Sequence, residues 1–497
     1  MTSRWVLAAA ATVGVAVAAA GAATMARRVR RGGGGRSGPI RRTSRAGRNA
    51  ELARMGLAVG STYASTGARK LFASADRRAA LDDARRLRSA EQVAERLGNM
   101  KGALMKVGQM ASYLDDGLPE PVRQALGALQ ADAPPMSAEL AAGVIERELG
   151  AGPDDVFVEW DPTPIAAASI GQVHRAVVVD PATGVERAVA VKVQYPGVGD
   201  AIGADLANTE LLGMLLRQGF SGLDPTEMVA EIKERISEEL DYRQEAANQT
   251  RFADWYRGHP FIHVPDVVPA FSSARVLTSD LVVGTSFRDV LQWDQHERDL
   301  AGEALFRFVF RSLYRMQAFN GDPHPGNYLF HGDGRITFLD FGLVRYFDDA
   351  ELAVFAAMVR SAAVDHDAAA FRRIVEAAGL LQQDAPVPTE AAGRYFSQFY
   401  EPVAHDRVTT WTPEYASAIV RHTFDRSSPI AQYASIPRSF VFIQRINLGL
   451  YALLGDLRAT GNYRRIAEEL WPFTDGAPST PMGETEAGWL TAVARPA

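Results

Sequence analysis

Two short acidic motifs in the second half of the chain constrain its fold more than any other feature. Asp322 and Asn327 have the spacing D-x-x-x-x-N within DPHPGN, and Asp340 opens a DFG directly after the apolar run Thr337-Phe338-Leu339. Such a run predicts a strand that delivers the next side chain to its end. Oxygen ligands of this kind suit Mg²⁺ that bridges phosphates. We therefore predict Asn327 and Asp340 as metal ligands, and Asp322 as a group that accepts a proton or positions a nucleophile.

A lysine-bearing strand upstream predicts a phosphate contact. Lys192 lies in the apolar run AVAVKVQ, where an unpaired charge would be costly. In kinases, the lysine of a V-A-I-K strand holds the α- and β-phosphates and pairs with a helix glutamate. The alternative is a strand-end lysine that extends to solvent. Glu239 and Glu245, both in the acidic run ERISEELDYRQEAANQ, are the candidate partners, although most acids of such a helix form a solvated face.

An alanine-rich loop precedes this strand. In AAASIGQV, Ala166, Ala168 and Gly171 fall on the glycine positions of the kinase pattern G-x-G-x-x-G-x-V. Alanine restricts φ where glycine does not, so we expect a stiffer loop over the nucleotide. We predict ATP contacts from Ala166, Ala167, Ala168 and Ser169. A chance turn in an alanine-rich chain is the alternative for this motif taken singly.

The order of these elements predicts an α+β, bilobal protein-kinase-like fold with ATP and Mg²⁺ as cofactors. The 497 residues suffice for two or three domains, and 47% hydrophobic and 23% charged residues are ordinary for a globular protein. The absence of cysteine excludes disulfides, cysteine–zinc sites and thiol catalysis.

The N-terminus predicts a membrane anchor. Residues 5–26 carry no charge, and Arg27, Arg28, Arg30 and Arg31 follow them. About 20 such residues suffice for one membrane-spanning helix, and the positive-inside rule places the following chain in the cytoplasm. A mitochondrial transit peptide, or a single pass in the inner mitochondrial membrane with the chain facing the matrix, is the rival interpretation. A basic start on an acidic body indicates an address or anchor, so we expect no nucleic-acid partner.

Taken together, the motifs resemble the UbiB/ADCK (AarF-type) family of atypical kinases over roughly residues 80–350. The residues that carry the resemblance are KVGQ at Lys106–Gln109, AAAS, VAVKVQYPGV at Val189–Val198, ELDYRQEA at Glu239–Ala246, DPHPGN and DFG. The resemblance implies a helical KxGQ extension, containing Lys106 and Gln109, that occludes the active site. It also implies an ion pair between Lys192 and Glu239, with Glu245 as an accessory acid.

Two positions depart from the family pattern. The family often has F-H-A-D before the catalytic proline, whereas this chain has Phe319-Asn320-Gly321-Asp322. What orients the backbone at Asp322 is therefore left open. The hinge reads LTSDLV, in which Ser279 would be a small gatekeeper behind the adenine.

The resemblance implies a membrane-associated atypical kinase or ATPase that supports quinone or other isoprenoid-lipid metabolism. Its partners would be a membrane lipid or isoprenoid-quinone precursor and biosynthetic enzymes. The alternatives are a nucleotide-binding pseudokinase scaffold and a small-molecule phosphotransferase. Only LVRYF separates DFG from a helix start at Asp348, and no A-P-E follows, so we expect no efficient transfer to extended peptides. The predicted regions are an anchor (1–26), a basic linker (27–75), the KxGQ extension (76–136), an N-lobe (137–283), a helical C-lobe (284–472) and a loose tail (473–497).

Overall fold

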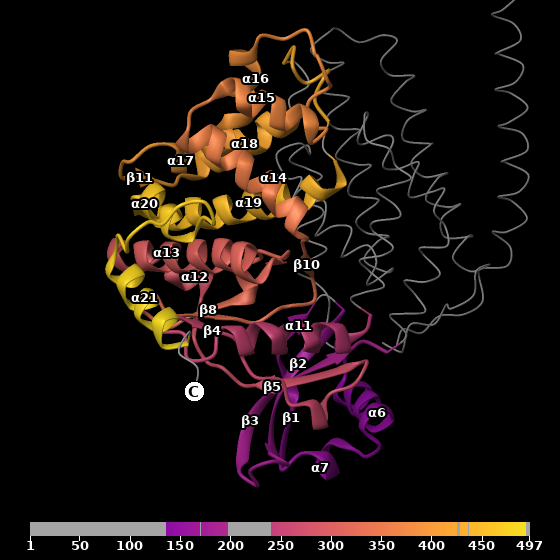
Figure 1. The fold of residues 1–497 in the computed structure, drawn as a ribbon. Helices are drawn as coiled ribbons and strands as arrows, with labels where there is room; N and C mark the ends of the chain where they lie inside the picture. Colours follow the sequence, from indigo (N-terminus) through magenta and orange to yellow (C-terminus); the bar gives the residue numbers. More distant parts are fainter. Residues whose placement is uncertain (1–135, 169, 197–239, 425–427, 436, 494–497) are drawn as a thin grey trace, which may run out of the picture. The chain divides into compact units, whose positions relative to one another are not determined.

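The computed structural model describes residues 136–168, 170–196, 240–424, 428–435 and 437–493 (Figure 1). The chain divides into residues 1–48 and 49–497, and the described residues all belong to the second unit. The predicted anchor, the linker and almost all of the KxGQ extension, with Lys106 and Gln109, lie outside the described residues. Ser169 and Glu239 lie outside them as well.

The first part of the described chain is built on a four-stranded antiparallel sheet in the order β1-β2-β3-β5. The strands are β1 (Glu159–Ala168), β2 (Gly171–Val179), β3 (Glu186–Gln194) and β5 (Val276–Asp280). Helix α6 (Ala138–Leu149) begins at the N-cap Ser137 and ends at Gly150, which adopts a left-handed conformation. It packs against one face of the sheet, where Val191 and Val193 are fully buried. Helix α7 (Pro153–Val156) follows α6.

Helix α11 (Tyr242–Trp255) connects the two parts of the described chain. Asp241 caps its N-terminus by accepting a hydrogen bond from the backbone N–H of Arg243. The helix contacts β5 on one side (Figure 1). Phe252 of the helix packs against Phe308 and Phe341. Its buried residues include Tyr242, Glu245, Gln249 and Phe252, the spacing of one inward-facing stripe.

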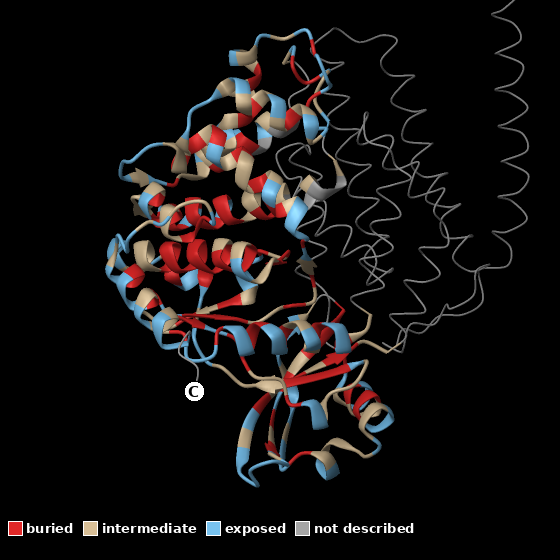
Figure 2. Ribbon diagram, in the orientation of Figure 1, coloured by how far each residue is buried: buried red, intermediate tan, exposed pale blue. Residues whose placement is uncertain are grey.

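The second part is mainly helical around the long helix α13 (Gln295–Arg311) and a small sheet. Every residue of α13 from Ala301 to Val309 is buried, as Figure 2 shows in red. The small sheet has the order β4-β9-β8-β6, with β4 (Ile262–His263), β6 (Thr285–Ser286), β8 (Tyr328–Phe330) and β9 (Ile336–Phe338). The two-stranded pairs are β7 (Ala318–Asn320) with β10 (Val344–Tyr346) and β11 (Thr409–Thr410) with β12 (Thr460–Gly461). The remaining helices are α12 (Phe287–Val290), α14 (Asp349–Val359), α15 (Ala368–Ala377), α16 (Thr389–Ser397), α17 (Glu401–Ala404), α18 (Pro413–Phe424), α19 (Arg438–Leu457), α20 (Tyr463–Leu470) and α21 (Pro481–Val493).

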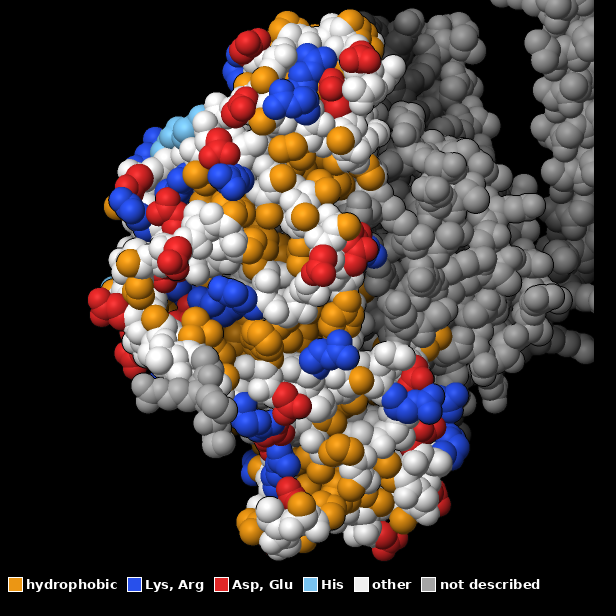
Figure 3. Space-filling model, in the orientation of Figure 1, with side chains coloured by type: hydrophobic (Ala, Val, Ile, Leu, Met, Phe, Trp, Pro, Cys, Tyr) orange, Lys and Arg blue, Asp and Glu red, His pale blue; other side chains and the backbone are white. Residues whose placement is uncertain are grey.

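The described residues therefore form the predicted α+β arrangement, an antiparallel sheet region followed by a mainly helical region. On the face drawn in Figure 3, acidic and basic side chains of the described residues are interspersed rather than segregated by sign. Among the described helices, none combines the length and the apolar character needed to cross a membrane. The segment 5–26 lies outside these residues, so the anchor remains a prediction.

The C-terminal segment differs from the sequence prediction. We expected a loose tail after residue 472, but residues 481–493 form helix α21, in which Met482 and Glu486 are buried. The Trp489 indole N–H donates a hydrogen bond to the Arg257 carbonyl, and its ring packs on His259. A Pro/Gly/Thr-rich composition predicts weak local structure, but it does not reveal a buried partner far away in the sequence.

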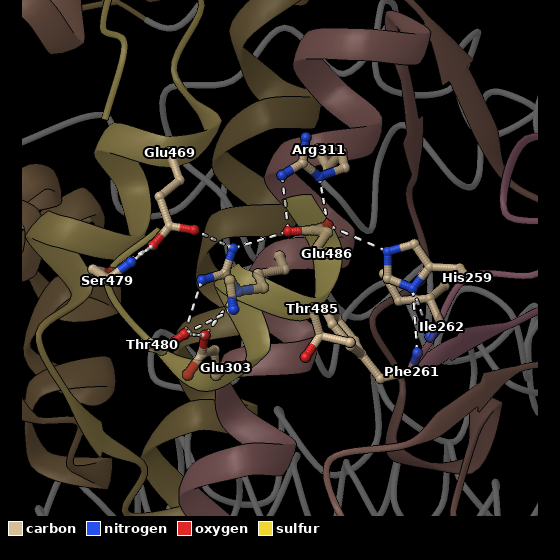
Figure 4. Close-up of polar contacts among 12 residues, drawn as sticks. His259, Phe261, Ile262, Glu303, Arg311, Glu469, Ser479, Thr480, Thr485 and Glu486 are labelled. Atoms are coloured by element: carbon tan, nitrogen blue, oxygen red, sulfur yellow. Dashed lines mark hydrogen bonds and ion pairs between the residues drawn. The ribbon is translucent and has the colours of Figure 1, made fainter. Parts of the chain in front are cut away.

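Helix α21 is attached through a group of buried charges that we call the arginine cluster: Glu303, Arg307, Arg311, Glu469 and Glu486. Glu486 accepts hydrogen bonds from Arg307 and Arg311 of α13, and its carboxylate lies between Arg311 and His259 (Figure 4). Arg307 is fully buried and donates to Glu303 at 2.8 Å, Glu469 at 2.8 Å and Glu486 at 2.9 Å. Each buried charge therefore has hydrogen-bonded partners of opposite sign, as a buried ion needs.

Candidate nucleotide site

The strand register brings the sequence-predicted residues onto one face of the first sheet. Directly paired residues of antiparallel strands share a face. Ala166 pairs with Val173, Val173 pairs with Lys192, and Ala190 pairs with Ser279. Alternate residues of β3 therefore place Ala190 and Lys192 opposite the buried Val189, Val191 and Val193. The face that carries Lys192 is the one that a nucleotide would contact.

The alanine-rich segment is a strand end rather than a long loop. Ala166, Ala167 and Ala168 belong to β1, and Ala168 pairs with Gly171 of β2. Gly171 is needed because an added Cβ would lie 2.8 Å from the Tyr242 hydroxyl and against the Val193 carbonyl. The hairpin therefore packs closely on β3 and α11. This packing explains the glycine at this position without any bound phosphate.

Lys192 lies at the centre of a second charged group, the lysine cluster, which consists of Lys192, Glu245 and Asp340. The Lys192 ammonium donates to both carboxylate oxygens of Glu245, at 2.7 and 2.8 Å, and lies 3.4 Å from Asp340 Oδ2. Burial by itself would lower the pKa of Lys192, but the Asp340 and Glu245 charges outweigh it and raise that pKa well above its ordinary value. The ammonium is thus kept charged and held in place. A strand-end lysine extended to solvent would have neither partner.

In the structure, Lys192 pairs with Glu245. The resemblance assigned the pair to Glu239, which precedes the Asp241 cap and lies outside the described residues. Helix α11 begins only at Tyr242, and Glu245 then shares its buried stripe with Tyr242 and Gln249. The phase of the helix, set by its N-cap, therefore directs Glu245 toward β3.

The catalytic-loop residues lie between β7 and β8. Asn327 Nδ2 donates to the carbonyl of Asp322 at 3.0 Å and to its carboxylate at 3.3 Å. This orientation makes Oδ1 of Asn327 the oxygen that a cation would use. Pro323 packs against Gly449 of α19, where an added Cβ would overlap the proline ring. Helix α19 therefore supports the loop. The two segments are far apart in the sequence, so no local pattern could have predicted this contact.

The DFG segment directly follows β9. Asp340 Oδ1 accepts a hydrogen bond from the backbone N–H of Gly342 at 3.0 Å, and the side chain is 31% exposed. Phe341 is fully buried against Phe252 of α11. Burial raises the pKa of Tyr328, and the nearby charges of Asp322 and Asp340 add to this rise. The Leu339 backbone N–H donates to the Asn327 carbonyl at 3.0 Å, so the residue before Asp340 lies beside the loop that carries Asn327.

The residues present suit a magnesium ion held with a nucleotide rather than a metal site made of protein alone. Among the described residues, no group of three or more histidine and acidic side chains could hold a metal ion. Mg²⁺ in phosphate-transfer sites usually has one or two carboxylates, with phosphates and water as the other ligands. A partly exposed Asp340 beside the Asn327 loop and the charged Lys192 matches this donor set.

The segment after DFG is short, as predicted. Strand β10 pairs with β7, and α14 begins directly after Asp348. Asp348 and Glu351 form a reciprocal capping box, which confirms the predicted helix start. The sequence analysis missed two residues of α11: Asn248, which donates to the Phe341 carbonyl, and Tyr242, whose ring centroid lies 5.1 Å from the Lys192 ammonium. Their spacing of three residues on either side of Glu245 was the available signal.

Comparisons with known proteins agree with this arrangement. Residues 128–375 match the model of the ABC1 atypical kinase-like domain. The chain is 33% identical over 279 residues to the mitochondrial atypical kinase COQ8B of Rattus norvegicus, and the match covers 55% of this chain and 52% of the relative. It is 34% identical over 252 residues to the probable protein kinase UbiB of Xanthomonas campestris, covering 48% and 45%. The chain thus spans about half the length of these curated relatives.

A solved structure is also similar to this chain. Its title describes the complex of Rv3197 with erythromycin from Mycobacterium tuberculosis. The sequence identity is 32%, the TM-score is 0.58, and the match covers 78% of this chain and 96% of that one.

Proposed function

Because the chain belongs to the ABC1 atypical kinase-like family, we propose that it is a membrane-associated ATPase or kinase that binds Mg²⁺–ATP and supports quinone or other isoprenoid-lipid metabolism. The observation that supports this proposal best is the lysine cluster. A charged Lys192 is held by Glu245 and lies beside Asp340, on the sheet face that carries the alanine segment.

Each residue would have a separate task. Lys192 holds phosphate oxygens, and its raised pKa keeps it cationic throughout the physiological range. Asn327 and Asp340 would hold Mg²⁺, which when bound neutralises the charge of the phosphates. Asp322, oriented by the Asn327 amide, would take the proton of the attacking hydroxyl or water. Ala190 and Ser279 present small side chains to the adenine.

The short segment after DFG restricts which molecules could accept a phosphoryl group from ATP. Only a few residues separate DFG from α14, too few to dock an extended peptide. Water, a small metabolite or a lipid headgroup are the remaining acceptors. The predicted anchor at residues 5–26, with the kinase region on the cytoplasmic or matrix side, favours a lipid. Biosynthetic enzymes of that lipid are the proposed protein partners.

The first test compares the full-length protein with its Asp340→Asn variant. We expect the variant to lose metal-dependent ATP binding and hydrolysis, because it lacks a ligand charge. Asp333→Asn is the matched control, since Asp333 is 83% exposed and has a left-handed conformation that asparagine tolerates. Equal Mg²⁺–ATP affinity of wild type and Asp340→Asn would refute the assignment.

The second test separates the acceptor classes. ATP hydrolysis is measured with anionic phosphatidylglycerol liposomes, with liposomes that contain isoprenoid-quinone precursors, and with a random peptide library. We expect stimulation by lipid and no transfer to peptide. Robust transfer to peptides without a lipid response would overturn the proposal, whereas Mg²⁺–ATP binding without turnover would favour the pseudokinase scaffold. Erythromycin is a further ligand to test, since the solved relative's title names it.

The third test concerns the anchor. Carbonate extraction of the full-length chain should leave it with the membranes, while a chain without residues 1–31 should be released. Equal release of both forms would exclude an anchor in this segment.

A further inference from the structure

Two asparagine side chains hold consecutive carbonyl groups of the DFG segment. Asn320 Nδ2 donates to the Asp340 carbonyl at 2.7 Å, and Asn248 Nδ2 donates to the Phe341 carbonyl at 3.0 Å. The first asparagine comes from β7 and the second from α11. Two elements far apart in the sequence thus fix the backbone on which the Asp340 carboxylate is carried.

Asn320 links this backbone to the catalytic loop. Its side-chain oxygen accepts a hydrogen bond from the backbone N–H of Asp322, at 3.4 Å, while its amide donates to Asp340. The backbone of Asn320 pairs with Val344, and the Gly321 N–H donates to the Leu343 carbonyl. The pairing of β7 with β10 therefore fixes the chain after DFG, at Leu343 and Val344. The buried Asn320 side chain fixes its start, at Asp340.

Asn248 links the same backbone to the helix that holds Lys192. It lies three residues after Glu245 on α11, and its side-chain oxygen accepts the Tyr346 hydroxyl at 3.0 Å. The Arg251 guanidinium lies over the Tyr346 ring at 4.7 Å. Helix α11 therefore contacts both Phe341 within the DFG segment and β10 after it.

We propose that Asn320 and Asn248 are positioning residues that set the Asp340 carboxylate for its metal, a proposal that rests on the function proposed above. An amide donates and accepts at once and does not titrate, so Asn320 can hold Asp322 and Asp340 together at any pH. It stands where the resembling family often has histidine. Asn248 adds a second contact that holds the DFG backbone. A phosphorylated activation segment is therefore not required to hold it.

The test of Asn320 uses substitutions that differ in hydrogen bonding. Asn320→Leu has a similar size but can neither donate to the Asp340 carbonyl nor accept from the Asp322 N–H, and it adds no charge. Asn320→His, as the neutral imidazole, keeps one donor and one acceptor. Gln249→Leu is the matched control, because Gln249 is buried on α11 but donates to the Pro265 carbonyl, away from the DFG segment.

Two readouts on the full-length protein separate positioning from folding. In Asn320→Leu, we expect the half-saturating Mg²⁺ concentration for ATP turnover to rise about tenfold, because a buried hydrogen-bonding partner is lost. The Kd for ATP without metal should stay within about twofold, since Lys192 and its sheet face are unchanged. Asn320→His should recover most of the Mg²⁺ affinity, and Asn248→Ala should show a smaller rise of about threefold.

Amide hydrogen exchange in the nucleotide-free protein is the second readout. The amides of Asp322 and Gly342, whose acceptors are Asn320 and Asp340, should exchange several-fold faster in Asn320→Leu than in wild type or Gln249→Leu. Unchanged exchange together with an unchanged Mg²⁺ requirement would overturn the proposal, as would equal effects in Gln249→Leu. A wild type without Mg²⁺–ATP turnover would defeat the proposed function, while the exchange comparison would still decide whether the asparagines hold the segment.

Discussion

The arginine cluster and the lysine cluster both pair cationic side chains with carboxylates, but they differ in their exposure to solvent. In the arginine cluster, Arg307 and Arg311 are 0% and 4% exposed, and Glu486 is 1% exposed. In the lysine cluster, Lys192 is 15% exposed and Asp340 is 31% exposed. The arginine cluster is therefore closed to solvent, whereas the lysine cluster is open to solvent at Asp340, the predicted metal ligand.

The protonation states follow from this difference. Burial alone would raise the pKa of Glu486, but the His259 hydrogen bond and the charges of Arg311 and Arg307 lower it to about 2. Burial lowers the pKa of His259. Its Nδ1 accepts the backbone N–H groups of Phe261 and Ile262, so the neutral ring donates from Nε2 to Glu486. The closed arginine cluster holds helix α21 in place. In the open lysine cluster, Lys192 or Asp340 can give up a contact within the protein to bind a ligand.

The largest expected effect is that of Glu486→Ala in the closed cluster. Arg307 and Arg311 would remain buried without their shared carboxylate, which should lower the free energy of unfolding by about 3–5 kcal/mol. Chemical denaturation measures this change. Glu484→Ala, which removes an exposed acid of the same helix, is the control and should change stability by less than ~0.5 kcal/mol. Equal effects of the two substitutions would show that the cluster does not fasten α21.

The same carboxylate predicts how stability depends on pH. The folded pKa of Glu486, about 2, lies below its ordinary value of 4.5, so the ionised group stabilises the folded protein above about pH 4.5. This contribution, about 3 kcal/mol, should be lost as the pH falls from 4.5 toward 2. Denaturation at a series of pH values measures the slope. Glu486→Gln should remove this part of it, and an unchanged slope would contradict the assignment.

In the open cluster, Glu245→Gln should affect activity more than stability. Lys192 is partly exposed and keeps Asp340 as a partner, so we expect a loss of stability of about 1 kcal/mol. Turnover of ATP should fall about tenfold, because the ammonium is no longer held by a bidentate carboxylate. Gln244→Ala, an exposed neighbour on α11, is the control. A loss of stability as large as that of Glu486→Ala would remove the distinction between the clusters.

The smallest expected effect is that of Ala168→Gly at the edge of the open site. Ala168 pairs with Gly171 at the end of the β1–β2 hairpin, and glycine would loosen the backbone by roughly 0.5–1 kcal/mol. We expect a change of about threefold in the ratio of ATP to ADP affinity without unfolding. Isothermal titration with both nucleotides measures this ratio. An identical ratio in wild type and variant would mean that the segment does not contact phosphate.

The placement of the phosphate-site candidates could be predicted because short-range patterns carry it. The apolar run before Asp340 forms β9, and the apolar run around Lys192 forms β3. The helix start at Asp348 follows from its capping residues alone. Each of these features depends on neighbours within a few residues, so spacing in the sequence translates directly into position on an element.

The sequence by itself determined the α+β order of elements, the strand that carries Lys192 and the helix start at Asp348. Only the tertiary structure decided that Glu245 pairs with Lys192, that Asn320 joins the two motifs, and that α21 is a docked helix rather than a loose tail. These three outcomes depend on contacts between residues far apart in the chain, such as Glu486 with Arg307. A residue pattern specifies local periodicity and capping, but the direction in which an element faces is fixed by the buried groups that it meets after folding.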